Sequence, residues 1–470
     1  MGSPTMPRKK VKNILFTSNS TTFTKRQLPL IIELENRGYN VTTISYSKQA
    51  TEILRLKGKK VEYIIDYFDN YNLKNVEKEL EKYEEKYDTN MNLIITGDKN
   101  YTWKKRDTAK RDLVKHFKFW EYYLIKNKVD VIFGAQERFI DMVPRIVGAY
   151  FGSTQLAYKQ NMFPGTFTVV KDPIGRWHTL NKFWGRNKNR KLTSIEYKRA
   201  KKYWNNTKKK KLVAPGNQVF IAPQLNDLRL FIISLYNNWR YEKFRNPYAN
   251  LYHIGKEQTL RVLRKPISKV FTEKPIKNEK YIYFPLTRSG DAQILLRAPQ
   301  YYNQLELIKI VSRYIPAGYK LYVKQHPTGE GEFDLRDLNS IRKIENVRLI
   351  DTYMNTHEIL KNASAVITIN SNTGIEALLY KKPTILLGNV YYDISNMFIK
   401  VRDFYDLPKS IKKALKMKFN DDEILKFINA LLESTHKGHT LFVRKFNKYL
   451  YDAKNIKNIV DGFEKEFKLL

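Results

Sequence analysis

The apolar and polar positions of the first 160 residues alternate short strand-like runs with longer segments of helical spacing. The runs are rich in β-branched residues and end at polar or glycine positions, as strands do. Strands are predicted at Val11–Thr17, Asn40–Tyr46, Val61–Ile65, Leu93–Thr96 and Val129–Phe133. Helical patterns such as Lys25–Arg37 and Thr108–Lys126 lie between them. This order predicts a parallel sheet with helices on both faces.

A second series of the same kind begins near residue 281. Its predicted strands are Tyr281–Pro285, Lys320–Lys324, Val347–Ile350, Ala365–Ile369 and Thr384–Leu387, and its predicted helices are Tyr302–Tyr314, Thr356–Lys361 and Thr373–Tyr380. The fold class is therefore expected to be α/β, with two Rossmann-like domains that face each other across a cleft. Ligands of such sheets bind where the carboxyl ends of the strands open.

The two series set the expected domain organisation. Residues 1–10 are expected to be a tail or a cloning remnant, residues 11–265 an N-terminal domain, and residues 276–470 a C-terminal domain with a helical end. The proline-containing segment between the two domains is the predicted linker. Residues 176–215 are a basic insertion in the N-terminal domain, interleaved with aromatic residues. This insertion is either a solvated helical arm or a surface for an acceptor or a membrane.

Composition narrows the classes of function. The chain has 470 residues, of which 42% are hydrophobic, and this is enough to build two cores. It has no cysteine, which excludes disulfides, zinc–thiolate sites and cysteine nucleophiles. The sequence contains neither a membrane-spanning apolar run nor the apolar core of a signal peptide, so a cytoplasmic protein is expected.

The formal net charge of +38 leaves several kinds of partner open. Anionic sugars, anionic lipid at the inner face of the membrane and nucleic acid are all attracted to a basic protein. A compositional bias of the source would also produce such a charge. Nucleic acid is the least favoured partner, because the sequence contains no zinc-finger spacing, RNA-recognition aromatic motif or basic zipper.

The most informative motif lies in the segment Ala365–Gly388, where a buried strand runs into the residues NSNTG (370–374) and then a helix. Free backbone N–H groups at such a junction, together with the hydroxyls of Ser371 and Thr373, suit a phosphate. Glu376 would then accept hydrogen bonds from a ribose diol. The alternative is a capping box, in which Thr373 caps the helix and Glu376 only reaches back to the backbone.

Two other predicted strands of the second series end in polar residues. Lys324 closes one strand and is followed by His326 and Pro327, and this proline restricts the backbone so that the imidazole has a defined direction. The ring is expected either to donate to a phosphate or to be structural, as most histidines are. Arg288, in the loop after Tyr281–Pro285, has the fork geometry for a phosphate or a sugar carboxylate.

Two acids of the first series are candidates for a general base. Glu137 follows the strand Val129–Phe133 and is expected to face the cleft. Asp172 lies in the segment FPGTFTVVKDPIG, which is either a plain turn or a way of placing this carboxylate in the cleft. No Asp-x-Asp motif is found, so no metal site is expected.

Together these segments resemble the capsule polysaccharide biosynthesis family of Kdo-transferase-like enzymes, which have the GT-B fold. The C-terminal likeness rests on YIYFPLTRSGDAQ, GYKLYVKQHPTGEG and VITINSNTGIEALLYKKPTILLG, which are similar to the family's K-x-H-P and N-S-x-x-G-x-E-A-L motifs in order and spacing. In the N-terminal half, MFPGTFTVVKDPIGRW is similar to the family's R-P-(D)-x-x-T-x-D-x-x-G segment, with Phe163 in place of the usual arginine.

The resemblance implies a glycosyltransferase that moves a sugar from a nucleotide-activated donor, best matched by a CMP-sugar such as CMP-Kdo, onto a surface or capsular glycan or glycolipid. The donor site that it implies consists of Lys324, His326, Pro327, Ser371, Asn372, Thr373 and Glu376. No metal or other cofactor is required, because basic side chains can stabilise the leaving phosphate. The alternatives are a nucleotide-sugar 2-epimerase of the same fold and a non-catalytic basic protein that binds membrane or nucleic acid.

Overall fold

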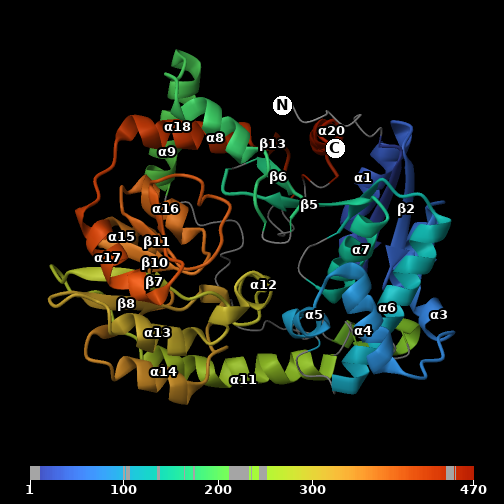
Figure 1. The fold of residues 1–470 in the computed structure, drawn as a ribbon, viewed down its shortest axis with the longest axis horizontal. Helices are drawn as coiled ribbons and strands as arrows, with labels where there is room; N and C mark the ends of the chain where they lie inside the picture. Colours follow the sequence, from blue (N-terminus) through green and yellow to red (C-terminus); the bar gives the residue numbers. More distant parts are fainter. Residues whose placement is uncertain are drawn as a thin grey trace. The chain divides into compact units, whose positions relative to one another are not determined.

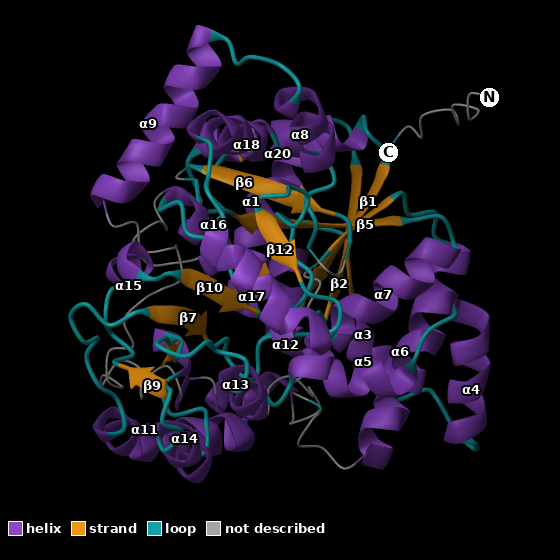
Figure 2. Cartoon of the chain, turned by 60° about the vertical axis from the view of Figure 1, so that its left-hand side comes forward, coloured by secondary structure: helices purple, strands orange, loops and turns teal. Residues whose placement is uncertain are grey.

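The computed structural model describes residues 11–98, 101, 106–134, 138–163, 165–172, 175–210, 232–233, 235–242, 251–440, 449 and 451–470. Internal contacts divide the chain into two compact units. Unit 1 takes its described residues from Met1–Asp172, Leu225–Leu251 and Thr435–Leu470, and unit 2 from Pro173–Gln224 and Tyr252–Ser434. Figures 1 and 2 show that each unit combines a sheet with surrounding helices.

Unit 1 is built on a seven-stranded sheet with the order β13-β6-β5-β4-β1-β2-β3. Its strands are β1 (Asn13–Ser18), β2 (Asn40–Ser45), β3 (Val61–Tyr63), β4 (Val131–Phe133), β5 (Thr154–Gln160), β6 (Thr166–Val170) and β13 (His436–Lys437). Strands β1 to β5 are parallel, whereas β6 is antiparallel to β5 and β13 is antiparallel to β6. The order 3-2-1-4-5 within this sheet is that of a doubly wound fold.

The helices of unit 1 cover both faces of this sheet. They are α1 (Thr21–Asn36), α2 (Lys48–Leu56), α3 (Ile64–Phe68), α4 (Val76–Tyr87), α5 (Met91–Gly97), α6 (Arg106–Lys126), α7 (Phe139–Tyr150), α20 (Ala453–Phe467) and the π-helix η1 (Asn238–Glu242). Alternate residues of β1, such as Phe16, pack in one core with Leu34 of α1 and Phe463 of α20. The C-terminal helix is therefore part of the core of unit 1.

Unit 2 is built on a six-stranded, fully parallel sheet with the order β12-β11-β10-β7-β8-β9. Its strands are β7 (Tyr281–Pro285), β8 (Lys320–Lys324), β9 (Val347–Ile350), β10 (Ala365–Thr368), β11 (Thr384–Leu386) and β12 (Phe398–Lys400). The first three strands wind outward in one direction from β7, and the last three wind outward in the other. This reversal between β7 and β10 is the switch point of a doubly wound sheet.

The helices of unit 2 are α8 (Leu180–Lys188), α9 (Ser194–Lys210), α11 (Leu251–Val270), α12 (Ala292–Leu295), α13 (Gln304–Ser312), α14 (Leu335–Arg342), α15 (Thr356–Asn362), α16 (Thr373–Leu379), α17 (Leu407–Lys416), α18 (Asp421–Glu433) and the short 3₁₀ segments η2 (Pro299–Tyr301), η3 (Pro327–Gly329) and η4 (Phe404–Asp406). The first residue of α11 is assigned to unit 1. None of the described helices is both long enough and apolar enough to span a membrane.

The side chains of β7 alternate between two cores. Ile282 and Phe284 pack in the cluster that contains residues of α13 and α14, whereas Tyr281 and Tyr283 pack in the cluster that contains residues of α15 and α16. Figure 1 shows these helix pairs below and above the sheet. A strand buried on both faces reads as one continuous apolar run, and this is why the sequence predicted the strand from its first to its last residue.

Three predicted domain assignments differ from the structure. Residues 252–265, predicted in the N-terminal domain, belong to unit 2. The basic insertion belongs to unit 2, because Trp184 of α8 packs edge-to-face on Phe427 of α18 at 5.2 Å between ring centroids, and Trp204 Nε1 of α9 donates to the carbonyl of Leu379 at 2.7 Å. These aromatic residues are thus buried anchors and not an exposed binding surface. Residues 435–470 belong to unit 1, since α20 fills its core.

The strand predicted at Leu93–Thr96 is wrong, because this segment lies in α5. Asn90 caps the helix by accepting a hydrogen bond from Leu93 N at 2.8 Å, and Met91, Ile94 and Ile95 are buried along one helical face. A four-residue apolar run has no periodicity that separates a short helix from a strand.

Candidate functional site

Unit 2 contains a pocket of about 360 Å³ at the carboxyl ends of β7, β8 and β10. These three strands are neighbours, and the switch point of the sheet lies between β7 and β10. Doubly wound sheets bind their ligands in this position. The pocket is lined by Tyr283, Pro285, Leu286, Thr287, Arg288, Asp291, Gln293, Lys324, Gln325, His326, Pro327, Thr328, Thr356, Asn370, Ser371, Asn372, Thr373 and Glu376.

All the residues predicted for the donor site line this one pocket, although they come from three separate segments. They are Arg288 from the loop after β7, Lys324, His326 and Pro327 from the end of β8, and Ser371, Asn372, Thr373 and Glu376 from the start of α16. The parallel pairing of β10 with β7 and of β7 with β8 brings the three carboxyl-terminal segments to the same edge. The sequence could place each residue at a strand end, and the sheet order supplies their convergence.

Lys324 is the buried cation of the pocket. Its side chain is only 3% exposed, and its Nζ donates to Thr356 Oγ1 at 3.3 Å. Burial lowers the pKa of Lys324 to about 8, although the nearby carboxylates of Asp351 and Glu376 act in the opposite direction. A buried ammonium without a close carboxylate bonded to it is well placed to receive an anion.

His326 is held in a defined tautomer by the turn that follows it. Its Nδ1 accepts from Thr328 N at 3.2 Å and lies 2.7 Å from Thr328 Oγ1. Burial and the positive charges of Lys324 and Arg288 lower the pKa of His326 to about 4, so the ring is neutral at pH 7. A neutral imidazole whose Nδ1 accepts a hydrogen bond carries its proton on Nε2, which is then a donor. Pro327 begins the short η3 turn that fixes this arrangement.

The start of α16 has fewer free backbone amides than the sequence predicted. Thr373 N donates to Ser371 Oγ at 3.1 Å, and Gly374 N donates to the carbonyl of Ser371 at 3.2 Å. The helix has only seven residues, so its dipole is short as well. The polar groups that this segment can offer a ligand are therefore mainly the hydroxyls of Ser371 and Thr373 and the exposed side chain of Asn372.

The capping box predicted as an alternative is also not formed. The N-cap residue of α16 is Asn372, which makes no side-chain capping bond, and Thr373 is already inside the helix. The carboxyl group of Glu376 instead lines the pocket. Burial raises the pKa of Glu376 to about 7, and the positive charge of Lys324 limits this increase. A pocket carboxyl group whose pKa is raised by burial is typical of a ligand-binding or catalytic site.

The sequence analysis assigned no role to two buried amides in the pocket wall, Gln325 and Asn370. They are 4% and 5% exposed, and their Oε1 and Oδ1 atoms have no hydrogen-bond partner among the residues that the structure describes. Asn370 Nδ2 donates to the carbonyl of Gln293 at 2.5 Å, which fixes Asn370 Oδ1 as an acceptor. Gln325 lies between Lys324 and His326, and Asn370 begins the NSNTG motif, so their place within these motifs was the only signal in the sequence.

Arg288 lines the pocket, but its fork is already engaged. Both Nε and Nη2 donate to Glu332 Oε1, at 2.9 and 2.6 Å. The predicted pairing of this fork with a phosphate is therefore replaced, in this structure, by an ion pair within unit 2.

The two predicted catalytic acids do not belong to the described part of this pocket. Glu137 lies outside the described residues. Asp172 lies in unit 1, two residues after β6, where its charge acts on the half-buried Arg145 of α7. Among the residues described, no group of three or more His, Asp or Glu side chains is arranged to hold a metal ion.

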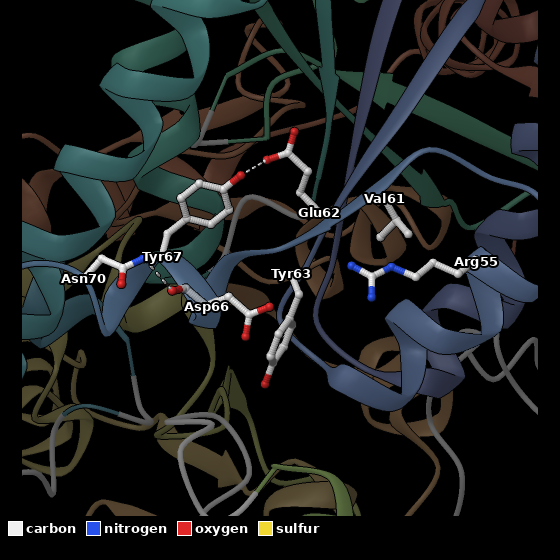
Figure 3. Close-up of a pocket in the computed structure, with 7 residues that line it drawn as sticks. All are labelled: Arg55, Val61, Glu62, Tyr63, Asp66, Tyr67 and Asn70. Atoms are coloured by element: carbon white, nitrogen blue, oxygen red, sulfur yellow. Dashed lines mark hydrogen bonds between the residues drawn. The ribbon is translucent and has the colours of Figure 1, made fainter.

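A second pocket, of about 270 Å³, lies in unit 1 beside β3. It is lined by Arg55, Val61, Glu62, Tyr63, Asp66, Tyr67 and Asn70. Figure 3 shows the Tyr67 hydroxyl turned toward Glu62, to which it donates at 2.8 Å. Two carboxylates face a single arginine here, so this pocket is poorly suited to a phosphate, whereas the pocket of unit 2 presents a buried ammonium.

The fold and the site together define a class of protein, an α/β chain of two doubly wound units in which unit 2 carries a polar pocket at its switch point. Residues 198–398, which include every lining residue of this pocket, match the model of a family described as "Capsule polysaccharide biosynthesis protein". This part of the chain is therefore similar in sequence to that family.

Curated relatives from bacteria show the same likeness. The chain is 32% identical over 130 residues to the capsule polysaccharide export protein KpsS of Escherichia coli, a match that covers 26% of this chain and 33% of that protein. It is 27% identical over 192 residues to the capsule polysaccharide modification protein LipB of Neisseria meningitidis serogroup A, covering 37% and 45%. The chain thus spans about a third to a half of the length of the curated relatives it matches.

Among solved structures, a β-Kdo 2,4 transferase, KpsC of Thermosulfurimonas dismutans, aligns with 12% identity and a TM-score of 0.38. The alignment covers 64% of this chain and 79% of that chain. Similarity at this level does not assign an activity.

Proposed function

We propose that this chain is a glycosyltransferase of capsule polysaccharide biosynthesis and that the pocket of unit 2 binds the nucleotide part of its activated sugar donor. The observation that carries the proposal is the convergence of Lys324, His326 and Ser371 on one pocket at the switch point of a parallel sheet, within the part of the chain that matches the family.

The phosphate of the donor is proposed to lie between Lys324 and His326. The Lys324 ammonium supplies the opposing charge, and a bound phosphate raises its pKa and keeps it protonated. The neutral His326 donates from Nε2, and the hydroxyl of Thr373, which accepts from Ser371 Oγ at 3.0 Å, adds a further donor. These groups stabilise the negative charge that develops on the phosphate as the sugar leaves.

The nucleoside is proposed to contact Glu376 and the side-chain amide oxygens of Gln325 and Asn370, which have no partner among the described residues. The carboxylate of Glu376 accepts hydrogen bonds from ribose hydroxyls. The acceptor Asn370 Oδ1 suits an exocyclic amino group, which cytosine has and uracil lacks. The amide of Gln325 adds a second buried polar contact. This chemistry supports a CMP-sugar, such as CMP-Kdo, over a UDP-sugar.

In the proposed transfer a hydroxyl oxygen of a glycan or glycolipid acceptor forms a bond to the anomeric carbon of the sugar. The bond from that carbon to the phosphate oxygen breaks, and CMP leaves with the bonding electrons. The acceptor proton passes to a carboxylate, for which Glu137 and Asp172 are the proposed candidates. Because Lys324 and His326 are proposed to stabilise the charge of the phosphate, no metal ion is needed for this role. We therefore expect turnover to survive treatment with EDTA.

A thermal-shift screen with CMP, UDP, GDP and ADP tests the donor class, since only a ligand of the native state raises the melting temperature. We expect the largest shift with CMP, and no shift with CMP in the double variant Lys324→Met/His326→Ala. Equal shifts in the wild type and this variant would contradict the site.

The activity test is release of CMP from a CMP-sugar that depends on an added glycan acceptor. Turnover of UDP-GlcNAc without an acceptor would favour a 2-epimerase. Binding of DNA or vesicles with no affinity for any nucleotide would favour a non-catalytic basic protein.

A further inference from the structure

A surface helix of a soluble domain usually packs its apolar face on the domain and exposes its polar face. In helix α11 this arrangement is reversed. The face that packs on unit 2 is charged: Arg261 Nη2 donates to the carbonyl of Thr328 at 2.6 Å, and Arg264 pairs with Asp334 at 3.2 Å. The packing is tight, because a Cβ atom on Gly331 would lie 2.6 Å from the carbonyl oxygen of Arg261. Figures 1 and 2 show α11 alongside α14.

The opposite face of α11 is an exposed apolar row. Its members are Leu260, Leu263, Ile267 and Val270, with exposed fractions of 38%, 62%, 47% and 74%. Their spacings of three, four and three residues place them on one side of the helix. Single exposed apolar residues are ordinary, but a contiguous row of four on one helix marks an interaction surface.

The surroundings of this row are basic. Helix α11 contains five Lys or Arg residues and one Glu. Lys256 and Lys269 are exposed on the helix, and Lys274 and Lys277 are exposed just after it. The two acids of this following segment, Glu273 and Glu279, both form ion pairs with Arg348, which offsets part of their charge. The apolar row therefore has a positively charged rim.

We propose that this outer face of α11 docks on an anionic lipid bilayer, with the helix lying in the plane of the interface. An apolar stripe with flanking lysines is the arrangement that binds headgroups and the first part of the acyl region together. A second copy of the chain is a poorer occupant, because pairing two such faces would bring two basic rims together in a protein of net charge +38. The proposal does not rest on the proposed catalytic function.

Docking at this face would hold the pocket of unit 2 in a fixed relation to the bilayer. Arg261 donates to the carbonyl of Thr328, and the amide of the same Thr328 donates to His326 Nδ1. The helix is thus connected through one residue to the turn that orients the imidazole of the pocket.

Co-sedimentation of the full chain with vesicles tests the proposal. The vesicles are made of phosphatidylglycerol and phosphatidylcholine in equal parts, or of phosphatidylcholine alone. We expect binding to the mixed vesicles, weak binding to phosphatidylcholine, and a loss of about tenfold or more in partitioning for Leu263→Ser/Ile267→Ser. The charge variant Lys256→Glu/Lys269→Glu is expected to weaken binding by a similar factor at low salt.

The matched control is Leu56→Ser/Ile125→Ser, which removes two apolar side chains of unit 1 that are 85% and 68% exposed. This variant is expected to bind vesicles as the wild type does. Equal binding of the α11 variant and the wild type, or no binding of the wild type, would overturn the proposal. If the wild type fails to bind vesicles but sediments as a dimer that Leu263→Ser/Ile267→Ser dissociates, the occupant is a second copy.

Discussion

The switch points of the two sheets have the same topology and opposite chemistry. In unit 1 the residues beside the junction of β1 and β4 bond to one another: Thr17 Oγ1 lies 3.4 Å from Asp141 Oδ1, and Gln155 Nε2 donates to the carbonyl of Asp141 at 2.9 Å. All three are at most 5% exposed, and a Cβ atom on Gly134 would lie 2.7 Å from Thr17 Oγ1. Among the residues described at this junction, the side chains bond to one another.

In unit 2 the corresponding position holds a pocket of about 360 Å³, with a buried ammonium on Lys324 and unpaired acceptors on Gln325 and Asn370. Burying these groups lowers stability, because the two acceptors have no partner among the described residues and the ammonium has only the neutral Thr356 hydroxyl. The comparison shows that a doubly wound sheet only offers a place for a ligand. The side chains at the strand ends decide whether that place is used, and in unit 2 they leave a pocket lined by a buried ammonium.

The largest effect is expected from Lys324→Met, which keeps the length of the side chain and removes its charge. The variant should bind CMP about a hundredfold more weakly, as expected for loss of a buried charge-assisted contact. Its stability should stay equal or rise, since burial of the ammonium is unfavourable. Isothermal titration and thermal unfolding measure the two quantities. The matched control is Thr17→Val in unit 1, which should leave CMP affinity unchanged.

The pH dependence of CMP affinity tests whether the ammonium form of Lys324 is needed to bind the phosphate. The pKa of Lys324 is about 8 in the free protein, and only the ammonium form attracts phosphate. Affinity should therefore be highest below pH 8 and fall about tenfold by pH 9. Because the folded-state pKa lies below the ordinary lysine value, this group destabilises the fold most below pH 8 and progressively less as the pH rises toward that value. The decline in affinity should be absent in Lys324→Met, and an identical decline there would assign it to another group.

His326→Ala is expected to weaken CMP binding by about tenfold, the loss of one hydrogen bond to a charged group. With a pKa of about 4, the imidazole stays neutral from pH 5.5 to 7, so its contribution should not grow on mild acidification. A ratio of wild-type to variant affinity that stays constant over this range supports a neutral Nε2 donor. A ratio that increases as the pH falls would mean that the charged imidazolium is the binding form.

The smallest effects are expected from leucine substitutions at one buried glutamine in each unit. Gln155→Leu in unit 1 removes a satisfied hydrogen bond and should lower the free energy of unfolding by about 1–3 kcal/mol. Gln325→Leu in unit 2 removes an unpaired acceptor, so stability should change little while CMP affinity falls a few-fold. Chemical denaturation of the two variants checks this difference. Equal destabilisation would mean that Gln325 is as well satisfied as Gln155.

Much of the fold and the core of the site could be predicted from the sequence, for a physical reason that also explains the failures. Strands buried on both faces, such as Tyr281–Pro285, are read directly from their apolar runs. Polar residues at the end of such a strand or just after it, such as Lys324 and His326, are predicted at the sheet edge. The short helix α5 was predicted as a strand because its apolar run is too brief to show a period.

The other failures concern contacts between residues far apart in sequence. The return of residues 435–470 to unit 1 depends on Phe463 fitting a core formed by other strands. The ion pair that engages Arg288 depends on Glu332, which belongs to another loop. The amides of Thr373 and Gly374 donate hydrogen bonds to Ser371, through a local geometry that the sequence alone does not determine. The local sequence pattern predicts helices and strands, whereas tertiary packing determines which hydrogen-bond donors remain available to a ligand.

Hydrogen exchange measured by mass spectrometry, with and without CMP, tests the central claim most directly, because it reports where on the chain the nucleotide acts. The account predicts slower exchange at 324–328 and 370–376 in unit 2, and unchanged exchange at 13–18 and 131–134 in unit 1. Protection confined to unit 1, or CMP binding without protection of either segment of unit 2, would contradict it.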